Sequence, residues 1–298
     1  MSSQFVLNHF MGIMKTVLVT GGAGNLGRRV SMILAQKGYR VRVFDLPEAD
    51  AAIADEHESI QVVTGNLIRS SDVESACQGI DWAVHLAAIM PPLSETNREL
   101  AETVNVAGTR VLLNVLPDDV PLVFASSVAT YGPAQKKIVK LDHPQQPVEL
   151  YGADKLRNEK DILADGRPCV ILRISGISVP ALLEIPRPWF FTLNQKMEYV
   201  HLADVALAVT ACVDNPEILG RTLLIAGGGD WRMTGEDYSR AVCAAFDMPF
   251  RMATYRDKVA WSGWYHTDRS QQLLQYQRHT FAAYIDELKA LYRAATGG

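Results

Sequence analysis

The sequence predicts an α/β fold, a doubly wound parallel sheet with a small C-terminal α/β lobe. In the first half of the chain, short runs of β-branched and apolar residues alternate with segments of helical character. Continuous apolar strands separated by helices are typical of a parallel sheet covered on both faces. A glycine-rich turn at residues 20–27 (TGGAGNLG) follows the first run and opens the first helix.

The predicted strands of this half are 16–20, 40–44, 60–64, 82–86, 122–125 and 169–174. The predicted helices are 25–38, 70–77, 100–116 and 151–163. Two such halves form the nucleotide-binding Rossmann fold. Beyond residue 175 three prolines interrupt the pattern, and we expect helices at 202–213, 234–246 and 270–276 and a strand at 221–226.

The predicted domains are therefore a Rossmann domain at 14–175 and a small lobe at 176–298. The lobe is expected to interleave with the Rossmann core, so that the chain forms one compact unit.

Composition describes an ordinary globular protein. The 298 residues are 48% hydrophobic and 21% charged, with a net charge of −4. This balance favours neither a nucleic-acid nor a membrane partner. Residues 1–14 lack the basic segment of a signal peptide, and the cysteines show no metal-ligand or C-x-x-C spacing. We expect reduced thiols and a cytoplasmic location.

The glycine-rich turn is suited to a dinucleotide. Gly21 would allow the tight turn, Gly24 would let the pyrophosphate approach the backbone, and Gly27 would let the helix pack on the sheet. The free N–H groups and the dipole of the following helix favour a negative charge there.

An acidic residue indicates which dinucleotide binds. Asp45 ends the second strand, 18 residues beyond Gly27. A carboxylate there accepts both ribose hydroxyls and repels a 2′-phosphate, which favours NAD over NADP. Arg28, Arg29 and Arg42 are close enough in sequence to keep NADP as the alternative.

Three polar residues suggest catalysis. Tyr151 and Lys155 lie four residues apart at the start of a helix, so they share one face. An ammonium and a positively charged nicotinamide would favour the phenolate of a tyrosine whose ordinary pKa is about 10. The spacing alone would also fit a surface pair. However, Ser127 ends the fifth strand, where this architecture places ligands.

Together these motifs resemble the extended short-chain dehydrogenase/reductase family, the NAD-dependent epimerases and dehydratases. The resemblance runs in order from residue 16 to about 204. It rests on the glycine-rich turn, Asp45, Ser127, the Tyr151/Lys155 pair and the segments 85–88 (HLAA), 105–109 (NVAGT), 131–132 (YG) and 172–173 (LR).

The resemblance implies specific roles. Tyr151 would be the general acid/base, Lys155 would bind the nicotinamide ribose and lower the pKa of the tyrosine, and Ser127 would hydrogen-bond the reacting oxygen. The residues expected to line the cofactor are Gly21, Gly24, Asn25, Leu26, Gly27, Asp45, Asn66, Leu67, Leu86, Ala87, Ala88, Asn105, Ala125, Tyr151, Lys155 and Ile174.

Some of these matches carry a second interpretation. Asn66 replaces the aspartate that the family places over the adenine, and Asn105 would equally serve as a helix-packing amide. Arg173 and Asp204 match family positions that we expect to be structural. We predict no metal site, because the histidines form no ligand set with nearby carboxylates.

The substrate side departs from the family's sugar-nucleotide enzymes. Gly176 stands where UDP-sugar epimerases have an asparagine, and residues 195–198 (QKME) lack the arginine that clamps a diphosphate. We therefore expect a smaller hydroxy or carbonyl compound, such as a free sugar or sugar acid. Arg173 and Arg187 are the candidates for binding a carboxylate.

The favoured function is an NAD-dependent oxidoreductase acting on such a small substrate. An epimerase or dehydratase that recycles its NAD is one alternative, and a non-catalytic NAD-binding protein is another. The resemblance also implies a homodimer that pairs helices 100–116 and 151–163.

Overall fold

The computed structural model describes residues 14–182 and 184–297. Residues 1–13, to which most of the signal-peptide prediction refers, lie outside this part. Among the described residues, none of the helices combines the length and apolar character that crossing a bilayer requires. All four cysteines are buried free thiols.

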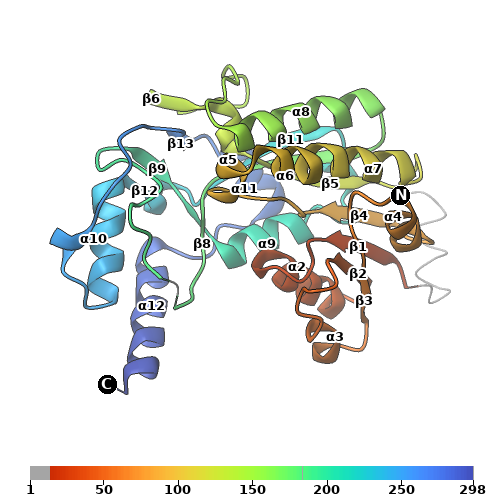
Figure 1. Cartoon of the computed structure of the whole chain (residues 1–298), viewed down its shortest axis with the longest axis horizontal. Helices are drawn as coiled ribbons and strands as arrows, with labels where there is room; N and C mark the ends of the chain where they lie inside the picture. The colour runs from red at the N-terminus through yellow and green to blue at the C-terminus, as the bar shows by residue number, and fades with distance from the viewer. Residues whose placement is uncertain (1–13, 183, 298) are drawn as a thin grey trace.

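A parallel sheet of seven strands forms the centre of the molecule (Figure 1). Its strands, in spatial order, are β11 (Arg221–Ile225), β7 (Cys169–Ile174), β5 (Leu122–Ser127), β4 (Trp82–His85), β1 (Thr16–Thr20), β2 (Arg40–Asp45) and β3 (Ile60–Thr64). Every neighbouring pair is parallel. The order reverses at β1. β2 and β3 lie on one side of it, and β4, which follows β3 in the chain, pairs with β1 on the other side. The predicted doubly wound α/β fold is confirmed.

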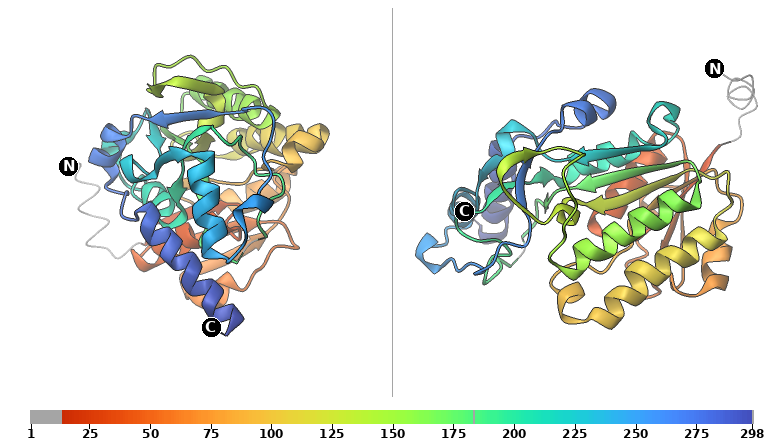
Figure 2. Two further views of the ribbon diagram at one scale, coloured as in Figure 1. Left: turned by 90° about the vertical axis from the view of Figure 1, so that its left-hand side faces the viewer. Right: turned by 90° about the horizontal axis from the view of Figure 1, so that it is seen from above.

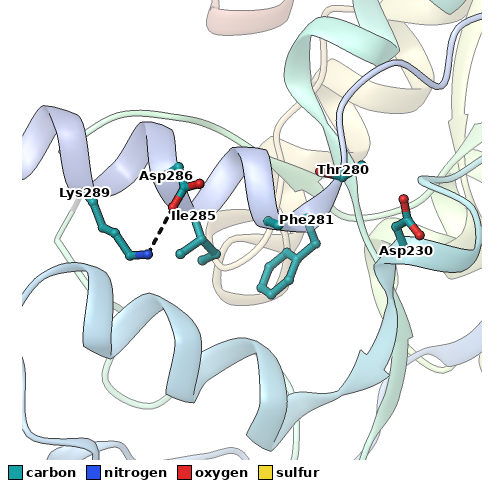
Figure 3. A pocket seen from close by; sticks show the side chains of 7 residues that line it. Asp230, Thr280, Phe281, Ile285, Asp286 and Lys289 are labelled. Carbon is teal, nitrogen blue, oxygen red and sulfur yellow. Dashed lines mark hydrogen bonds and ion pairs between the residues drawn. The ribbon is translucent and has the colours of Figure 1, made fainter.

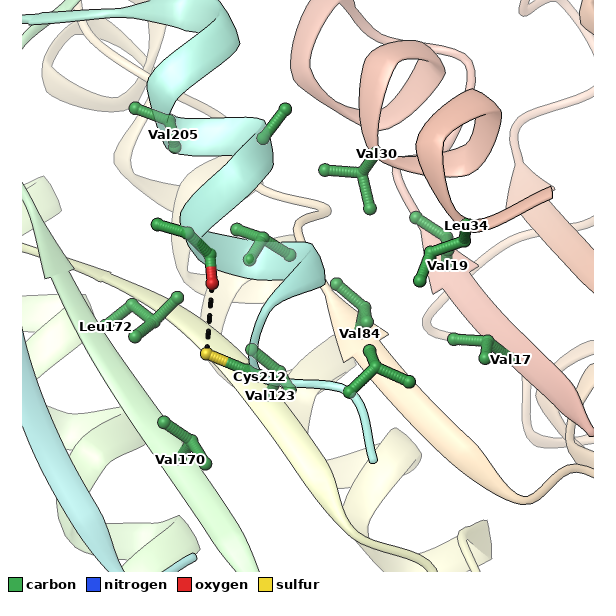
Figure 4. Packing of buried hydrophobic residues seen from close by; sticks show 14 of the residues in the cluster. Val17, Val19, Val30, Leu34, Val84, Val123, Val170, Leu172, Val205 and Cys212 are labelled. Atoms are coloured by element: carbon green, nitrogen blue, oxygen red, sulfur yellow. Dashed lines mark hydrogen bonds between the residues drawn. The ribbon is translucent and has the colours of Figure 1, made fainter. Parts of the chain in front are cut away.

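Helices cover both faces of the sheet. On one face α2 (Asn25–Gln36) and α9 (Leu202–Thr210) pack side by side. Their apolar side chains, Val30 and Val205 among them, lie over the strand valines in Figure 4. The other face carries α4 (Ser70–Cys77), α7 (Gly108–Val115) and α8 (Leu150–Asp165). Burying strands on both faces is what their continuous apolar sequences require.

The prediction of one continuous α-helix over 100–116 is wrong in the middle of the segment. The segment begins as α6 (Arg98–Ala101), loosens into the π-helical turn η1 (Glu102–Ala107) and continues as α7. Asn105 lies in the π-helical turn. Such turns are frequent at functional sites.

The lobe lies beyond the carboxyl ends of the strands (Figure 2). Its aromatic core joins α10 (Gly235–Ala245) to α12 (Phe281–Thr296), a helix that the sequence analysis missed. Two elements beyond residue 176, α9 and β11, belong to the seven-stranded core instead. The proposed division at residue 175 stays a prediction.

Shorter elements complete the chain. They are α3 (Ile53–Glu56), α5 (Leu93–Thr96), η2 (Val128–Tyr131), β6 (Pro133–Val139), β8 (Ile177–Ser178), β9 (Lys196–Glu198), β10 (Val200–His201), η3 (Pro216–Ile218), η4 (Gly229–Trp231), β12 (Arg232–Thr234), η5 (Phe250–Met252), β13 (Ser262–Tyr265) and α11 (Asp268–Leu274).

Candidate active site

The predicted site residues converge because all strands of the sheet run in one direction. Gly21 follows β1, Asp45 ends β2, Leu86 follows β4, Ser127 ends β5 and Ile174 ends β7. Carboxyl ends of parallel strands share one edge of the sheet, and ligands bind there at the point where the strand order reverses.

The glycine-rich turn leaves no room for side chains at two of its predicted positions. At Gly21, which has φ +68°, a Cβ would lie 2.8 Å from the main-chain nitrogen of Ala87. At Gly27 a Cβ would lie 2.1 Å from the Gly21 oxygen. Gly24 differs, since its Cβ would meet only that same oxygen, at 3.4 Å. Gly24 therefore borders open space, as a phosphate-approach position requires.

Sequence reasoning missed the adjacent Gly22. A Cβ there would lie 2.8 Å from both the Val19 oxygen and a methyl of Val43. A doubled glycine after a buried strand was the available signal.

The start of α2 is open to an anion. Its N-cap is Gly24, which has no side chain to accept from the first amides, and its first turn carries no acidic residue. Asn25 is exposed and Leu26 half-buried. These donors, together with the glycine cradle, fit the pyrophosphate of a dinucleotide.

Asp45, the predicted ribose-binding residue, is hydrogen-bonded to the glycine-rich turn. Its Oδ2 accepts from the Ala23 amide and its Oδ1 from the Leu46 amide, both at 2.9 Å. The side chain is half-buried. The carboxylate is thus oriented by two main-chain donors at the end of β2.

Two of the arginines that kept NADP open have other partners. Arg28 forms ion pairs with Asp50 and Glu56. Arg42 donates to the main-chain oxygens of Ala76 and Gln78, at 2.8 and 2.6 Å. Their charges are therefore already partly engaged by the protein.

The predicted adenine contacts lie beside β3. The Asn66 Oδ1 accepts from the Ile68 amide at 3.2 Å, so one lone pair of this oxygen is used within the turn. Leu67 is buried against Gly108, where a Cβ would lie 2.9 Å from a Leu67 methyl. Gly108 on α7 therefore leaves room for the Leu67 side chain.

The segment after β4 is held from two sides. The amides of Leu86 and Ala87 donate to Thr20, at 3.2 and 3.4 Å. Behind the segment, the buried Asn105 accepts from the Ile89 amide at 2.7 Å and donates to the Ile89 oxygen at 3.0 Å. Asn105 thus supports the lining segment, and its own contact with the cofactor stays a prediction.

Lys155 connects α8 to the sheet. Its buried Nζ donates to the Ala125 oxygen at 2.7 Å and lies 4.8 Å above the Phe124 ring. The same Nζ lies 5.6 Å from the centre of the Tyr151 ring. Desolvation lowers the pKa of Lys155 to about 8, against the opposing charges of Asp154 and Glu159.

Tyr151 corrects one expectation. Desolvation raises its pKa to about 12, so in the protein by itself burial outweighs the predicted lowering by Lys155. A tyrosine with this pKa is a proton donor at neutral pH. Ser127 lies half-buried at the end of β5, and its Oγ accepts from the Ala129 amide at 3.1 Å.

Arg173 is structural, as expected, and this corrects its candidacy as a carboxylate binder. Its guanidinium pairs with Glu159, with Nη2 to Oε2 at 2.7 Å, and donates to the Tyr131 hydroxyl at 2.6 Å. Glu159 also accepts from Ser126 and Gln145. Arg173 on β7 therefore stabilises the packing of α8 against the sheet.

Asp204 also has a structural role. It is fully buried and accepts from the main-chain amides of Arg278 and His279, at 3.0 and 3.1 Å. Arg187, the other proposed carboxylate binder, is exposed and contacts the Met248 sulfur. Within the described residues no cluster of His, Cys, Asp and Glu suits a metal ion.

An aromatic ring covers Gly176, just beyond the carboxyl end of β7. A Cβ at Gly176 would lie 2.1 Å from Cε1 of Tyr199, so an asparagine cannot stand there beside this ring. The Tyr199 ring packs against Trp261 and Tyr238, with ring centres 5.6 and 5.0 Å apart.

The segment that lacks the diphosphate-clamping arginine implied by the resemblance carries a carboxylate, Glu198. Glu198 is fully buried and accepts from Arg232 at 2.9 Å and from the Tyr265 amide at 2.8 Å. The positive charge of Arg232 is thus compensated inside the lobe.

A separate hollow of about 540 Å³ lies on α12 (Figure 3). Phe281 and Ile285 face it, and Lys289 pairs with Asp286 at its end. It includes no predicted site residue and lies away from the strand ends.

Two acidic residues that sequence reasoning missed act at the start of α8. Glu95 accepts from the amides of Leu150 and Tyr151, each at 2.9 Å. Glu149 pairs with Arg256 of the lobe at 2.7 Å. Neither contact leaves a local sequence signal, because the partners lie more than fifty residues apart.

Known proteins resemble this chain both in sequence and in structure. It is 31% identical over 182 residues to D-erythronate dehydrogenase of Cupriavidus necator, covering 55% of each chain. It is 27% identical over 203 residues to the decarboxylating sterol-4-alpha-carboxylate 3-dehydrogenase of Homo sapiens, covering 62% of this chain and 51% of that one. The chain spans about half the length of the curated relatives it matches.

A solved short-chain dehydrogenase/reductase superfamily protein from Agrobacterium tumefaciens, with bound NAD, has the same fold. The TM-score is 0.79 at 22% identity, over 95% of this chain and 98% of that one.

The model of the NAD-dependent epimerase/dehydratase family matches residues 17–178, more than half of the chain. The match begins in β1 and ends in β8, just beyond Gly176, and so includes every predicted catalytic and cofactor-lining residue. It confirms the resemblance found in the sequence and NAD as the cofactor. The chain therefore belongs to the NAD-dependent epimerase/dehydratase family.

Proposed function

We propose that the chain is an NAD-dependent oxidoreductase acting on a hydroxyl or carbonyl group of a small substrate, a free sugar or sugar acid. The observation that carries the proposal is the hydrogen bond of Lys155 to Ala125. It joins the helix that carries Tyr151 to β5, the strand that ends at Ser127, and so supports a shared site for the three residues.

The residues divide the chemistry among them. Oxidised NAD, when bound, would supply the hydride acceptor and a positive charge that favours the phenolate. Tyr151 takes the substrate's hydroxyl proton in oxidation, or returns it to the carbonyl oxygen in reduction. Ser127 hydrogen-bonds that oxygen, and the ammonium of Lys155 favours the phenolate. Since burial raises the pKa of Tyr151 to about 12, the phenol stays protonated in the absence of further positive charge.

The proposal of a small substrate is based on contacts within the lobe. Tyr199 covers Gly176, and Glu198 compensates Arg232, so neither of the family's nucleotide-sugar contacts is supported. The similarity to D-erythronate dehydrogenase supports a sugar acid as the first class to test.

The test compares the wild type with Tyr151→Phe on sugars, sugar acids and hydroxy acids selected by thermal shift with NAD. Acid/base catalysis contributes about 10²–10⁴ to the rate, so we expect NADH formation to fall at least about 100-fold. Tyr292→Phe, on α12, is the matched control. Unchanged turnover in Tyr151→Phe would sink the assignment.

The alternatives give different results in the same assay. An epimerase or dehydratase would convert its substrate without net NADH and tend to purify with NAD bound. A non-catalytic protein would bind NAD and convert none of the panel.

We also propose a homodimer through α6–α7 and α8, which lie side by side on one face of the sheet (Figure 1). Exposed Leu100 and Leu163 on these helices support it. Light scattering of the purified chain tests it. Cytoplasmic location stays a prediction.

A further inference from the structure

The helix that carries Tyr151 is capped by another part of the chain. The N-cap residue, Glu149, extends its side chain to Arg256 and forms no capping hydrogen bond. Instead the carboxylate of Glu95 accepts from both first amides of α8. Its Oε2 accepts from Leu150 and its Oε1 from Tyr151, each at 2.9 Å.

Glu95 is itself held in place. It lies half-buried on α5, and the fully buried Ser94 donates to its Oε1 at 3.2 Å. α5 follows closely after residues 86–88, which are predicted to line the cofactor, and after Ile89, which Asn105 holds. One short stretch of chain therefore borders the cofactor and holds the main chain of Tyr151.

This arrangement restricts the tyrosine. A carboxylate at a helix N-terminus interacts favourably with the dipole and satisfies amides that otherwise lack partners. Two bonds to adjacent amides oppose fraying of the first turn. Because Tyr151 lies in that turn, fraying would displace its ring from the reacting oxygen. Misplacement by about 1 Å can lower a rate about 100-fold.

We propose that Glu95 is a positioning residue for Tyr151, which ties the general acid/base to the segment lining the cofactor. The role assigned to Tyr151 rests on the proposed function. Glu95 itself is not expected to touch the substrate.

The experiment uses the full chain labelled with fluorotyrosine, in which Tyr151→Phe identifies the Tyr151 resonance. We expect Glu95→Ala to move or broaden this resonance and Glu95→Gln, which keeps one acceptor oxygen, to do so less. With a substrate from the panel, kcat should fall at least about tenfold in Glu95→Ala while KM for NAD stays within about twofold. A purely stabilising cap would lower the melting temperature alone.

Glu102→Gln is the matched control. Glu102 also contacts α8, through an exposed pair with Arg157 at 3.0 Å, but it touches no amide of the first turn. The Tyr151 resonance and the kcat of the Glu102→Gln variant should equal those of the wild type. If Glu95→Ala does not fold, Glu95→Gln decides.

Two results would overturn the proposal. One is a Tyr151 resonance at its wild-type position in every folded Glu95 variant, and the other is a displaced resonance with wild-type kcat. If no substrate is found, or if Tyr151→Phe turns over normally, the proposed function fails, and the resonance alone decides whether Glu95 positions the ring.

Discussion

The ammonium of Lys155 donates to the main-chain oxygen of Ala125 at 2.7 Å, and this bond fixes α8 against β5. It places a charge where almost no water reaches, since only 2% of the residue is exposed. Burial of the charged form explains why the pKa of Lys155 falls from 10.5 to about 8.

The first prediction concerns stability against pH. The folded chain releases the Lys155 proton near pH 8 and the unfolded chain near 10.5, so between these values the unfolded chain binds more protons. Stability therefore rises with pH in this window, and the full cost of the buried charge is present below it. Relative to Lys155→Met, the unfolding free energy of the wild type should rise by on the order of 2 kcal/mol between about pH 8 and 10.

Urea unfolding of both chains across this range measures the difference. Other titrating groups largely cancel in the comparison, because Lys155→Met keeps the apolar stem. A difference that stays flat or falls with pH would contradict the burial assigned to Lys155.

The second prediction separates stability from cofactor binding. Gly24 has φ −70°, and a Cβ there makes only an ordinary contact with Gly21. The free energy of unfolding of Gly24→Ala should therefore lie within about 1 kcal/mol of the wild-type value. Its methyl group would stand where the pyrophosphate approaches, so the Kd for NAD should rise at least about tenfold.

Gly229→Ala serves as the control, since a Cβ there meets nothing within 4 Å. Calorimetric titration with NAD measures both variants. If Gly24→Ala bound NAD as tightly as Gly229→Ala, the phosphate-approach role of Gly24 would be wrong.

The third prediction concerns the choice between NAD and NADP. Asp45→Asn keeps an oxygen for the Ala23 amide but removes the charge that repels a 2′-phosphate. The affinity for NADP relative to NAD should increase at least about tenfold, a change of about 1.4 kcal/mol. Asp50→Asn removes an exposed carboxylate that pairs with Arg28, and its ratio should change less. Equal ratios in the two variants would remove Asp45 from the discrimination.

The sequence predicted the parts of this site that depend on local pattern. The bounds of β1, β3 and β7 match the expected runs, because continuous apolar residues between turn signals leave little choice of register. Gly21 and Gly27 were found because the tight turn and the close packing of the helix there admit no side chain.

What the sequence did not reveal depends on tertiary contacts. The π-helical turn around Asn105 coincides with side-chain bonds to Ile89, which no helical period records. The pKa of Tyr151 is set by burial, which spacing to Lys155 cannot report.

The helix α12 did carry a signal, an N-cap at Thr280 and apolar residues at Tyr284, Ile285 and Leu288.

The last prediction tests the closed substrate end. A Cβ on Gly176 would lie 2.1 Å from the Tyr199 ring, which is held by Trp261 and Tyr238 and cannot move freely. Gly176→Ala should cost about 1–3 kcal/mol in the wild type, as overpacking does. With Tyr199→Ala in place the clash is gone, and the same substitution should cost little.

Urea unfolding of the two single variants and the double variant gives the coupling energy directly. Additive effects would show that the ring yields readily to a side chain at position 176. Strong coupling would mean that Tyr199 excludes an asparagine at this strand end. The ring, rather than the missing asparagine alone, would then set the limit on substrate size, and Tyr199→Ala should admit bulkier alcohols than the wild type binds.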